Sequence, residues 1–324
     1  MKDAYLPWEP SFPSRWDNSQ LEESRRCMRL FLYRYCWQLV PLKKGIALVY
    51  GSAIHAMLAA LYTGHPNPIK AFEATVIEEG FDDASWDKKR NPEAALSYLK
   101  DYVAIFQNDP LIPLRVEVKQ SFPLDEHVYT TKIDLIGKFE ETGIVAGLDH
   151  KTTSLNRNLF MKTAPLANQF AGYAWGLSQI FDTTTFGFNA LYVGVASRDL
   201  RFQRYYHTYS DAELHEWFAS VLWRIQMLEK LKHLILQPIF WEKNAPKTCC
   251  DYFSLCPYQI ICDNVEDSKY LIEDNFRQEL WEPDKADDGA ECKPITYVPE
   301  EVEPIEMTKP FEVKKAPVDD AIIS

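Results

Sequence analysis

The spacing of hydrophobic and polar positions changes from helical to strand-like at about residue 113. Residues 1–18 are rich in Pro and Trp and indicate an extended arm. From Ser19 to about Trp37 arginines are mixed with Leu, Phe and Tyr, which predicts a helix with a mixed face. From Gly51 to Tyr62 small and apolar residues recur at helical spacing. Residues 68–107 favour two or three more helices. We therefore expect a helical lobe at about residues 56–110, ahead of the strands.

Three strands are predicted after the change of period, at Arg115–Phe122, Tyr129–Phe139 and Ile144–Lys151. A helix near Ala164–Ile180 and two strands, Thr185–Val193 and Arg201–Tyr209, follow them. A capping box at Ser210–Glu213 opens a long helix to about Leu236. The order β-β-β-α-β, framed by helices, predicts an α/β fold with a central β-sheet.

Composition changes this picture mainly at the C-terminus. The 324 residues carry a net charge of −12, but 18 acidic and 7 basic residues after position 262 account for −11 of it. A nearly neutral body can still hold a basic groove, because local charge steers DNA more than net charge does. We expect a folded body at residues 1–283 and an acidic tail at 284–324 that is disordered or docks as extended chain.

No apolar run is long enough for a transmembrane helix, and the N-terminus lacks the apolar core of a signal peptide. We expect no membrane partner and a location in the cytoplasm of a bacterium or of a phage-infected host cell. Structural disulfides are then not expected from the seven cysteines.

Two short runs carry the main chemical signal, Thr131–Gly137 and Gly147–Thr153. In a strand, residues i and i+2 face the same side, so Asp149 and Lys151 point into one site and the His150 side chain points away. If the two strands pair, Asp134 joins them. Two carboxylates suit Mg²⁺ or Mn²⁺, and a nearby lysine can hold a water or stabilise charge on a phosphate. The alternative is an exposed charged strand edge.

Two helices add candidate side chains. His55 ends the run Gly51–His55, and a lone histidine there is either a core residue or a metal ligand in its neutral form. Gln169 and Tyr173 stand at i and i+4, on one helix face. They either line the site, where they could orient Lys151 or touch a phosphate, or form a solvated pair beside the core.

The cysteines give a second signal, because three of them recur at even spacing near the end of the body. Four thiolates suit a [4Fe–4S] cluster or Zn²⁺, while scattered buried thiols are the alternative. The proposed set is one remote N-terminal cysteine and the triplet within residues 250–262: Cys27, Cys250, Cys256 and Cys262.

Taken in their order along the chain, these motifs resemble the PD-(D/E)XK nuclease superfamily, and most closely its RecB-like members of the AddB and CRISPR-adaptation type. The resemblance covers about residues 19–283. It implies a mixed central sheet flanked by helices, with a [4Fe–4S] cluster that joins the N- and C-terminal parts and Zn²⁺ as the lesser alternative. It also implies metal ligands and catalytic residues at these positions: His55, Asp134, Asp149, the backbone carbonyl of His150, Lys151, Gln169 and Tyr173. Glu117 is a further acidic candidate.

The implied activity is Mg²⁺- or Mn²⁺-dependent hydrolysis of DNA, as an exonuclease on single strands or ends in phage recombination, replication or repair. Recombination or replication proteins are candidate partners. The chain has no Walker A run and hence no helicase motor of its own. Two rival classes stay open: a non-catalytic DNA-end-binding or CRISPR-adaptation-like assembly protein, and a zinc-stapled protein of another function.

The cysteine pattern departs from the resembled one. The triplet is spaced C-x5-C-x5-C rather than C-x2-C-x5-C, and Cys27 is not followed by a proline. Cys249 adjoins Cys250, so either could be the ligand. We expect Cys36 to be a packing residue and assign no role to Cys292.

Overall fold

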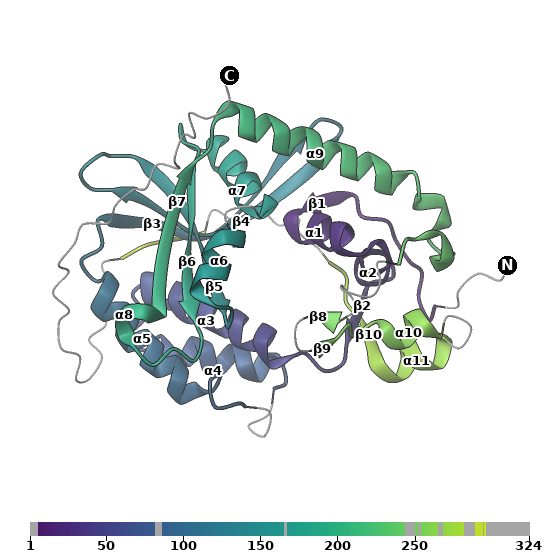
Figure 1. Ribbon diagram of the computed structural model, residues 1–324, viewed down its shortest axis with the longest axis horizontal. Coiled ribbons are helices and arrows are strands. Elements are labelled where there is room, and N and C mark those ends of the chain that lie inside the picture. Colours follow the sequence, from purple (N-terminus) through teal and green to yellow (C-terminus); the bar gives the residue numbers. More distant parts are fainter. Residues whose placement is uncertain are drawn as a thin grey trace, which may run out of the picture.

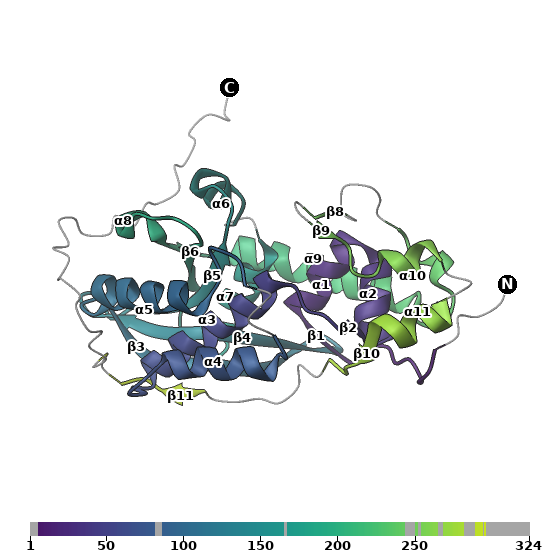
Figure 2. The ribbon, with the colours of Figure 1, turned by 90° about the horizontal axis from the view of Figure 1, so that it is seen from below.

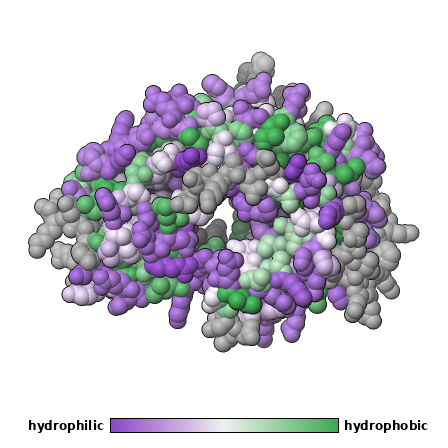
Figure 3. Space-filling model, turned by 180° about the vertical axis from the view of Figure 1, so that it is seen from behind, coloured by the Kyte–Doolittle hydropathy of each residue, from purple (hydrophilic) through white to green (hydrophobic). Residues whose placement is uncertain are grey.

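The computed structural model describes residues 6–81, 86–164, 167–243, 250–251, 254–264, 268–281, 289–293 and 295. Figure 1 shows a twisted sheet with helices on both faces, and a second group of elements in which the N-terminal and C-terminal parts of the chain lie together. Helix α9 (Asp211–Glu229) runs from the sheet to this second group. An opening is visible between the two parts in the space-filling view (Figure 3).

Within the described residues, seven strands form one mixed sheet, in the order β11-β3-β4-β5-β6-β7 with β1 beside the start of β4. Neighbouring strands are antiparallel except β5 and β6, and β1 and β4, which are parallel. The bounds are β1 (Arg15–Asp17), β3 (Leu111–Leu124), β4 (His127–Phe139), β5 (Val145–Thr153), β6 (Thr185–Tyr192), β7 (Phe202–Thr208) and β11 (Ala290–Glu291).

Helices cover the two faces of this sheet with separate apolar clusters (Figures 1 and 2). The first cluster involves α3 (Ile46–Tyr62), α4 (Ile69–Glu78) and α5 (Pro92–Phe106). The second involves α7 (Asn168–Ser178) and the start of α9. The parallel pair β5 and β6 needs a crossover connection, and α6 (Arg157–Thr163) and α7 supply it.

A third apolar cluster packs residues 16–39 and 241–276 against α9. Strands β2 (Leu39–Pro41) and β10 (Phe276–Gln278) pair there, and a short hairpin joins β8 (Cys250–Asp251) to β9 (Ser254–Leu255). The remaining helical elements are α1 (Asn18–Arg26), α2 (Met28–Phe31), the π-helix η1 (Leu32–Cys36), α8 (Arg198–Arg201), the 3₁₀ helices η4 (Lys232–Leu234) and η5 (Pro238–Phe240), α10 (Gln259–Asp263) and α11 (Ser268–Asn275).

The mixed α/β fold and the order β-β-β-α-β expected from the sequence are confirmed. The capping box is also present, because the Ser210 hydroxyl accepts from the Glu213 backbone N–H and the Glu213 carboxylate accepts from that of Ser210. The single helix expected at 19–37 is wrong. It is divided at Cys27, whose extended backbone (φ −163°) ends α1, and it finishes as a π-helix.

Strand β11 lies in the expected tail. It pairs with β3 at Arg115 and Val116, and the backbone N–H of Lys293 donates to the carbonyl of Tyr62 at 2.8 Å. The described helices include none with the length and apolar character needed to span a bilayer.

Candidate metal-dependent active site

The site lies at a gap in the sheet. Strand β5 pairs with β4 as far as the pair Leu148–Leu135, and β1 pairs with β4 only up to Thr130. Residues 131–134 of β4 therefore have neither strand beside them on that side. Asp134 and Asp149 each stand one residue beyond the last β4–β5 pair. Both carboxylates are buried, with 6% and 2% of the residue exposed, in a place where the backbone leaves room for them.

Asp149 and Lys151 share one face of β5, as the strand period predicts. The Lys151 Nζ lies 2.7 Å from Asp149 Oδ2 and 5.9 Å from the centre of the Phe170 ring. Apart from this ion pair, Asp149 Oδ2 has no hydrogen-bond partner among the described residues. Burial, opposed by Lys151 and assisted by Asp134, raises the pKa of Asp149. Such a carboxylate gains from a cation.

His55 joins the site from α3. Its Nδ1 lies 3.2 Å from Asp134 Oδ2, which also accepts the backbone N–H of His150 at 2.7 Å. Burial alone would raise the pKa of Asp134, but the His55 imidazole and these donors lower it well below its usual range. Burial lowers the pKa of His55, but the Asp134 carboxylate raises it, and the net effect is an increase. A metal bound here would compete with a proton for the His55 imidazole.

Gln169 and Tyr173 lie on one face of α7, as expected from their spacing. The Gln169 amide Nε2 donates to the Tyr173 hydroxyl at 2.9 Å. Burial, and then the charge of Asp149, raise the pKa of Tyr173 well above its ordinary value, so the phenol stays protonated. The pair faces the same side of the sheet as Lys151, because Phe170 on α7 is the ring beneath the lysine ammonium.

Glu117 lies on β3, opposite Asp134 on β4, in an unusual backbone conformation with φ 56°. Near Glu117, the side chains of both β3 and β4 switch from one face of the sheet to the other. Val116 and Leu135 belong to the cluster under α3–α5, whereas Val118 and Ile133, two residues away on each strand, belong to the cluster under α7. Regular strands keep i and i+2 on one face. The reversal at Glu117 therefore re-aims its side chain.

The re-aimed carboxylate reaches the metal candidates. One atom each of His55, Glu117 and Asp134 lie within 4.8 Å of one another, and Glu117 Oε2 lies 2.5 Å from Lys132 Nζ. Carboxylates with one imidazole fit a divalent cation. The sequence placed Glu117 among the candidates, but it did not indicate the contact with Lys132.

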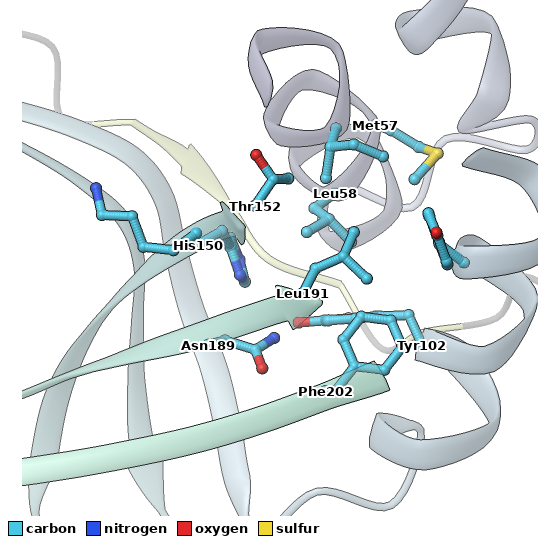
Figure 4. A pocket seen from close by; sticks show the side chains of 11 residues that line it. Met57, Leu58, Tyr102, His150, Thr152, Asn189, Leu191 and Phe202 are labelled. Carbon is cyan, nitrogen blue, oxygen red and sulfur yellow. The ribbon is translucent and has the colours of Figure 1, made fainter. Parts of the chain in front are cut away.

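The His150 ring points away from the carboxylates, as the strand period predicts. It stacks on Tyr62 with centroids 6.3 Å apart and meets the rings of Tyr102 and His55 edge to face. Figure 4 shows it beside Asn189 at a cavity of about 10 Å³. Burial lowers the pKa of His150 to about 4, so the ring is neutral. The predicted role of its backbone carbonyl as a metal ligand stays a prediction, since the contact seen at this residue is made by its N–H.

Three of the predicted cysteine ligands lie against the third apolar cluster, but the described residues do not bring their three sulfur atoms within 4.8 Å of one another. Cys27, Cys256 and Cys262 are half-buried against that cluster. The Arg29 guanidinium donates to Cys262 Sγ at 3.5 Å, and burial followed by the charge of Cys262 raises the pKa of Tyr33, with a smaller effect of Cys27.

The side chain of Cys250 and all of Cys249 lie outside the described residues. Cys36 is fully buried, as a packing residue would be, and Cys292 is half-buried beside β3.

A family model for the PD-(D/E)XK nuclease superfamily matches residues 15–263. The chain belongs to this superfamily. The match spans β1 through α10 and includes every candidate site residue named from the sequence. Membership carries nuclease chemistry and the use of divalent metals, and the His55, Glu117 and Asp134 group is where this member offers ligands for one.

Two solved structures resemble this superfamily member at low sequence identity. A candidate exonuclease from Eubacterium rectale shares 12% identity at a TM-score of 0.49, over 75% of this chain and 89% of its own. The protein SSO0001 shares 13% identity at a TM-score of 0.31, over 68% of this chain and 85% of its own. No curated protein matches the chain.

Proposed function

We propose that this superfamily member is a Mg²⁺- or Mn²⁺-dependent deoxyribonuclease. The observation that carries the proposal is the meeting of Asp134, Asp149, His55 and Lys151 at the gap in the sheet. His55, Asp134 and Asp149 would hold the cation, with Glu117 within reach as a further ligand. When bound, the cation would stabilise negative charge on the scissile phosphate.

The chain's own residues have separate roles in this account. Lys151 orients the attacking water or contacts a phosphate oxygen, since its ammonium is fixed between Asp149 and Phe170. Gln169 and Tyr173 are neutral donors on the same face and position Lys151 or the phosphate. His150 supports Asp134 through its backbone N–H.

The finer part of the proposal is exonucleolytic action on single strands or DNA ends in phage recombination, replication or repair, in the cytoplasm of a bacterium or infected host. Support comes from the resemblance of the motifs to RecB-like members. The alternative is a DNA-end-binding or assembly protein that keeps the fold without cleavage. The buried carboxylates beside Lys151 favour cleavage over that alternative, because burying them costs stability and DNA binding by itself does not need them.

A [4Fe–4S] cluster held by Cys27, Cys250, Cys256 and Cys262 is also proposed, with Zn²⁺ as the lesser alternative. Three of these thiols lie against the same apolar cluster, which supports it. Four thiolates are the donor set that both centres use. Such a centre would staple the two ends of the chain, far in sequence from the hydrolytic site.

The proposal is tested by digesting end-labelled single- and double-stranded DNA with the purified full chain in Mg²⁺, Mn²⁺ or EDTA. Metal-dependent loss of label from ends supports an exonuclease, and internal products indicate an endonuclease. Binding without cleavage in both metals would favour the assembly protein. Iron content and absorption near 400 nm decide between iron–sulfur and zinc.

A further inference from the structure

Strand β11 belongs to a part of the chain that the family match does not cover. The match ends at residue 263, whereas β11 lies at Ala290–Glu291 and forms one end of the sheet, beside β3. Figure 2 shows it in yellow at the lower edge of the molecule. Ala290 pairs with Val116 and Glu291 pairs with Arg115, directly before Glu117. The C-terminal part of the chain and the candidate metal site therefore meet on the same stretch of β3.

The approach to β3 is closest at Gly289. Its backbone has φ +70°, and a Cβ atom there would overlap the carbonyl oxygen of Val116 and lie 2.9 Å from Val118 Cγ2. Only glycine fits in such a place without strain. The Val116 carbonyl belongs to the peptide group that leads into Glu117, and the φ angle of Glu117 sets the orientation of that group. Gly289 thus lies against the peptide whose rotation produces the reversal.

Further contacts fix the same segment, residues 289–293, to the body. The backbone N–H of Cys292 donates to the Leu114 carbonyl at 3.0 Å, and that of Lys293 donates to the Tyr62 carbonyl at 2.8 Å. The Cys292 side chain packs against the apolar cluster under α3–α5. Tyr62 is the last residue of α3, the helix that carries His55. The 289–293 segment therefore joins β3 to the helix that supplies the imidazole of the site.

The opposite edge of β3 constrains Glu117 less. The β3–β4 ladder pairs Val116 with Leu135 and Val118 with Ile133, but it has no pair at Glu117. A non-glycine residue with a positive φ is strained, and it persists only where the surrounding contacts enforce that angle. The 289–293 segment supplies such contacts at the edge of β3 that β4 does not cover.

We propose that the 289–293 segment holds the backbone reversal at Glu117 and thereby keeps the Glu117 carboxylate within reach of His55 and Asp134. Gly289 is a positioning residue in this account, because it touches β3 and not the cation. Without the segment, β3 would relax toward a regular strand and the carboxylate would leave the group of ligands. This inference rests on the proposed function and adds to its metal site a segment from beyond the family match.

The first test follows the backbone by urea unfolding in EDTA. While Glu117 keeps its positive φ, Glu117→Gly should unfold at a higher urea concentration than Glu117→Ala. When each is combined with Gly289→Ala, whose Cβ forces the segment away from Val116, this difference should disappear or reverse, because alanine suits a regular strand better than glycine does.

Gly80→Ala is the matched control. Gly80 also has a positive φ, +64°, but a Cβ atom there would meet nothing within 4 Å. Combined with Gly80→Ala, the two Glu117 variants should keep their order. Hydrogen exchange at the Lys293 amide reports whether the segment has left β3 and α3. If that amide stays protected in Gly289→Ala, Cys292→Pro is added, since it removes the N–H that donates to Leu114.

The second test measures Mn²⁺ affinity by isothermal titration calorimetry. Gly289→Ala should weaken binding about as much as Glu117→Ala does, by about tenfold, and Gly80→Ala should bind like the wild type. The double variant of Gly289 and Glu117 should bind no more weakly than either single variant, because both changes remove the same ligand.

The inference is overturned if release of the segment leaves the order of the two Glu117 variants unchanged. It is also overturned if release leaves Mn²⁺ affinity at the wild-type value, which would make β11 a structural edge strand only. Additive losses in the double variant would contradict it as well, since the segment would then act on another ligand. A wild type that binds no Mn²⁺ would contradict the proposed function instead, and the urea comparison would still decide whether the segment holds the reversal.

Discussion

Asp134 and Asp149 occupy equivalent positions on antiparallel neighbours, each one residue past the last β4–β5 pair. Beyond this pair β5 leaves β4, and β1 takes its place beside β4 at residues 128–130. The two carboxylates thus share a site where the strand pairing is interrupted. Their pKa values move in opposite directions, since His55 and the His150 N–H stabilise the charge of Asp134 while burial disfavours that of Asp149.

Asp134→Asn should weaken Mn²⁺ binding by at least about tenfold, because it removes the charge that His55 and a cation would share. The fold should persist, since an amide oxygen can still accept the His150 N–H. Isothermal titration calorimetry measures the affinity. Asp199→Asn, at an exposed position on α8, is the control that should bind Mn²⁺ like the wild type. Equal affinities in all three proteins would remove Asp134 from the metal site.

Glu117 allows ligand and backbone effects to be separated. A non-glycine residue at φ 56° costs of order 1–3 kcal/mol, and glycine avoids most of that cost. Glu117→Gly should therefore be more stable than Glu117→Ala by about 1 kcal/mol, the reverse of the usual order in a strand. Both variants lose the carboxylate and should weaken Mn²⁺ binding to a similar extent. Urea unfolding and calorimetry give the two quantities, and a more stable alanine variant would contradict the strain.

His150 predicts a pH effect on stability. Its pKa is lowered by burial to about 4, whereas an unfolded histidine titrates near about 6.5. Between these values the unfolded chain binds a proton that the folded chain refuses, so stability is lost as the pH falls through this range. The raised pKa of Asp149 changes stability in the opposite direction, but this effect is common to the wild type and to a variant at position 150.

His150→Phe keeps a ring between Tyr62 and Tyr102 and cannot bind a proton. Its melting temperature in EDTA should therefore fall less than that of the wild type between about pH 7 and about pH 4.5. Differential scanning fluorimetry across this range measures both curves. Parallel curves would show that the folded protein protonates His150 normally.

The cysteine proposal predicts a division among single substitutions. Cys27→Ser, Cys256→Ser and Cys262→Ser should each lose bound iron or zinc and melt at a lower temperature, since metal binding contributes to folding stability. Cys292→Ser should keep the metal, because Cys292 lies beside β3, where its backbone N–H donates to Leu114. Metal analysis and melting curves check this. Wild-type metal content in Cys256→Ser would end the staple proposal.

The sequence predicts the strands and the shared face of Asp149 and Lys151 because both follow from the two-residue period within one strand. It predicts the Gln169–Tyr173 contact for the same local reason on a helix. The gap beside Asp134 could not be predicted, since it depends on β1, which is more than a hundred residues away in the chain. The reversal at Glu117 and the placement of α6 likewise depend on tertiary contacts that no local pattern encodes.

The most direct test of the account is single-turnover cleavage of an end-labelled single strand at saturating Mn²⁺ by the wild type and Lys151→Ala. Lys151 orients the reacting groups without holding the cation, so its loss should slow cleavage by about 10²–10³-fold while Mn²⁺ affinity stays near the wild-type value. Cleavage by Lys151→Ala at the wild-type rate, or no cleavage by the wild type in any divalent metal, would contradict the assignment of this gap in the sheet as a nuclease active site.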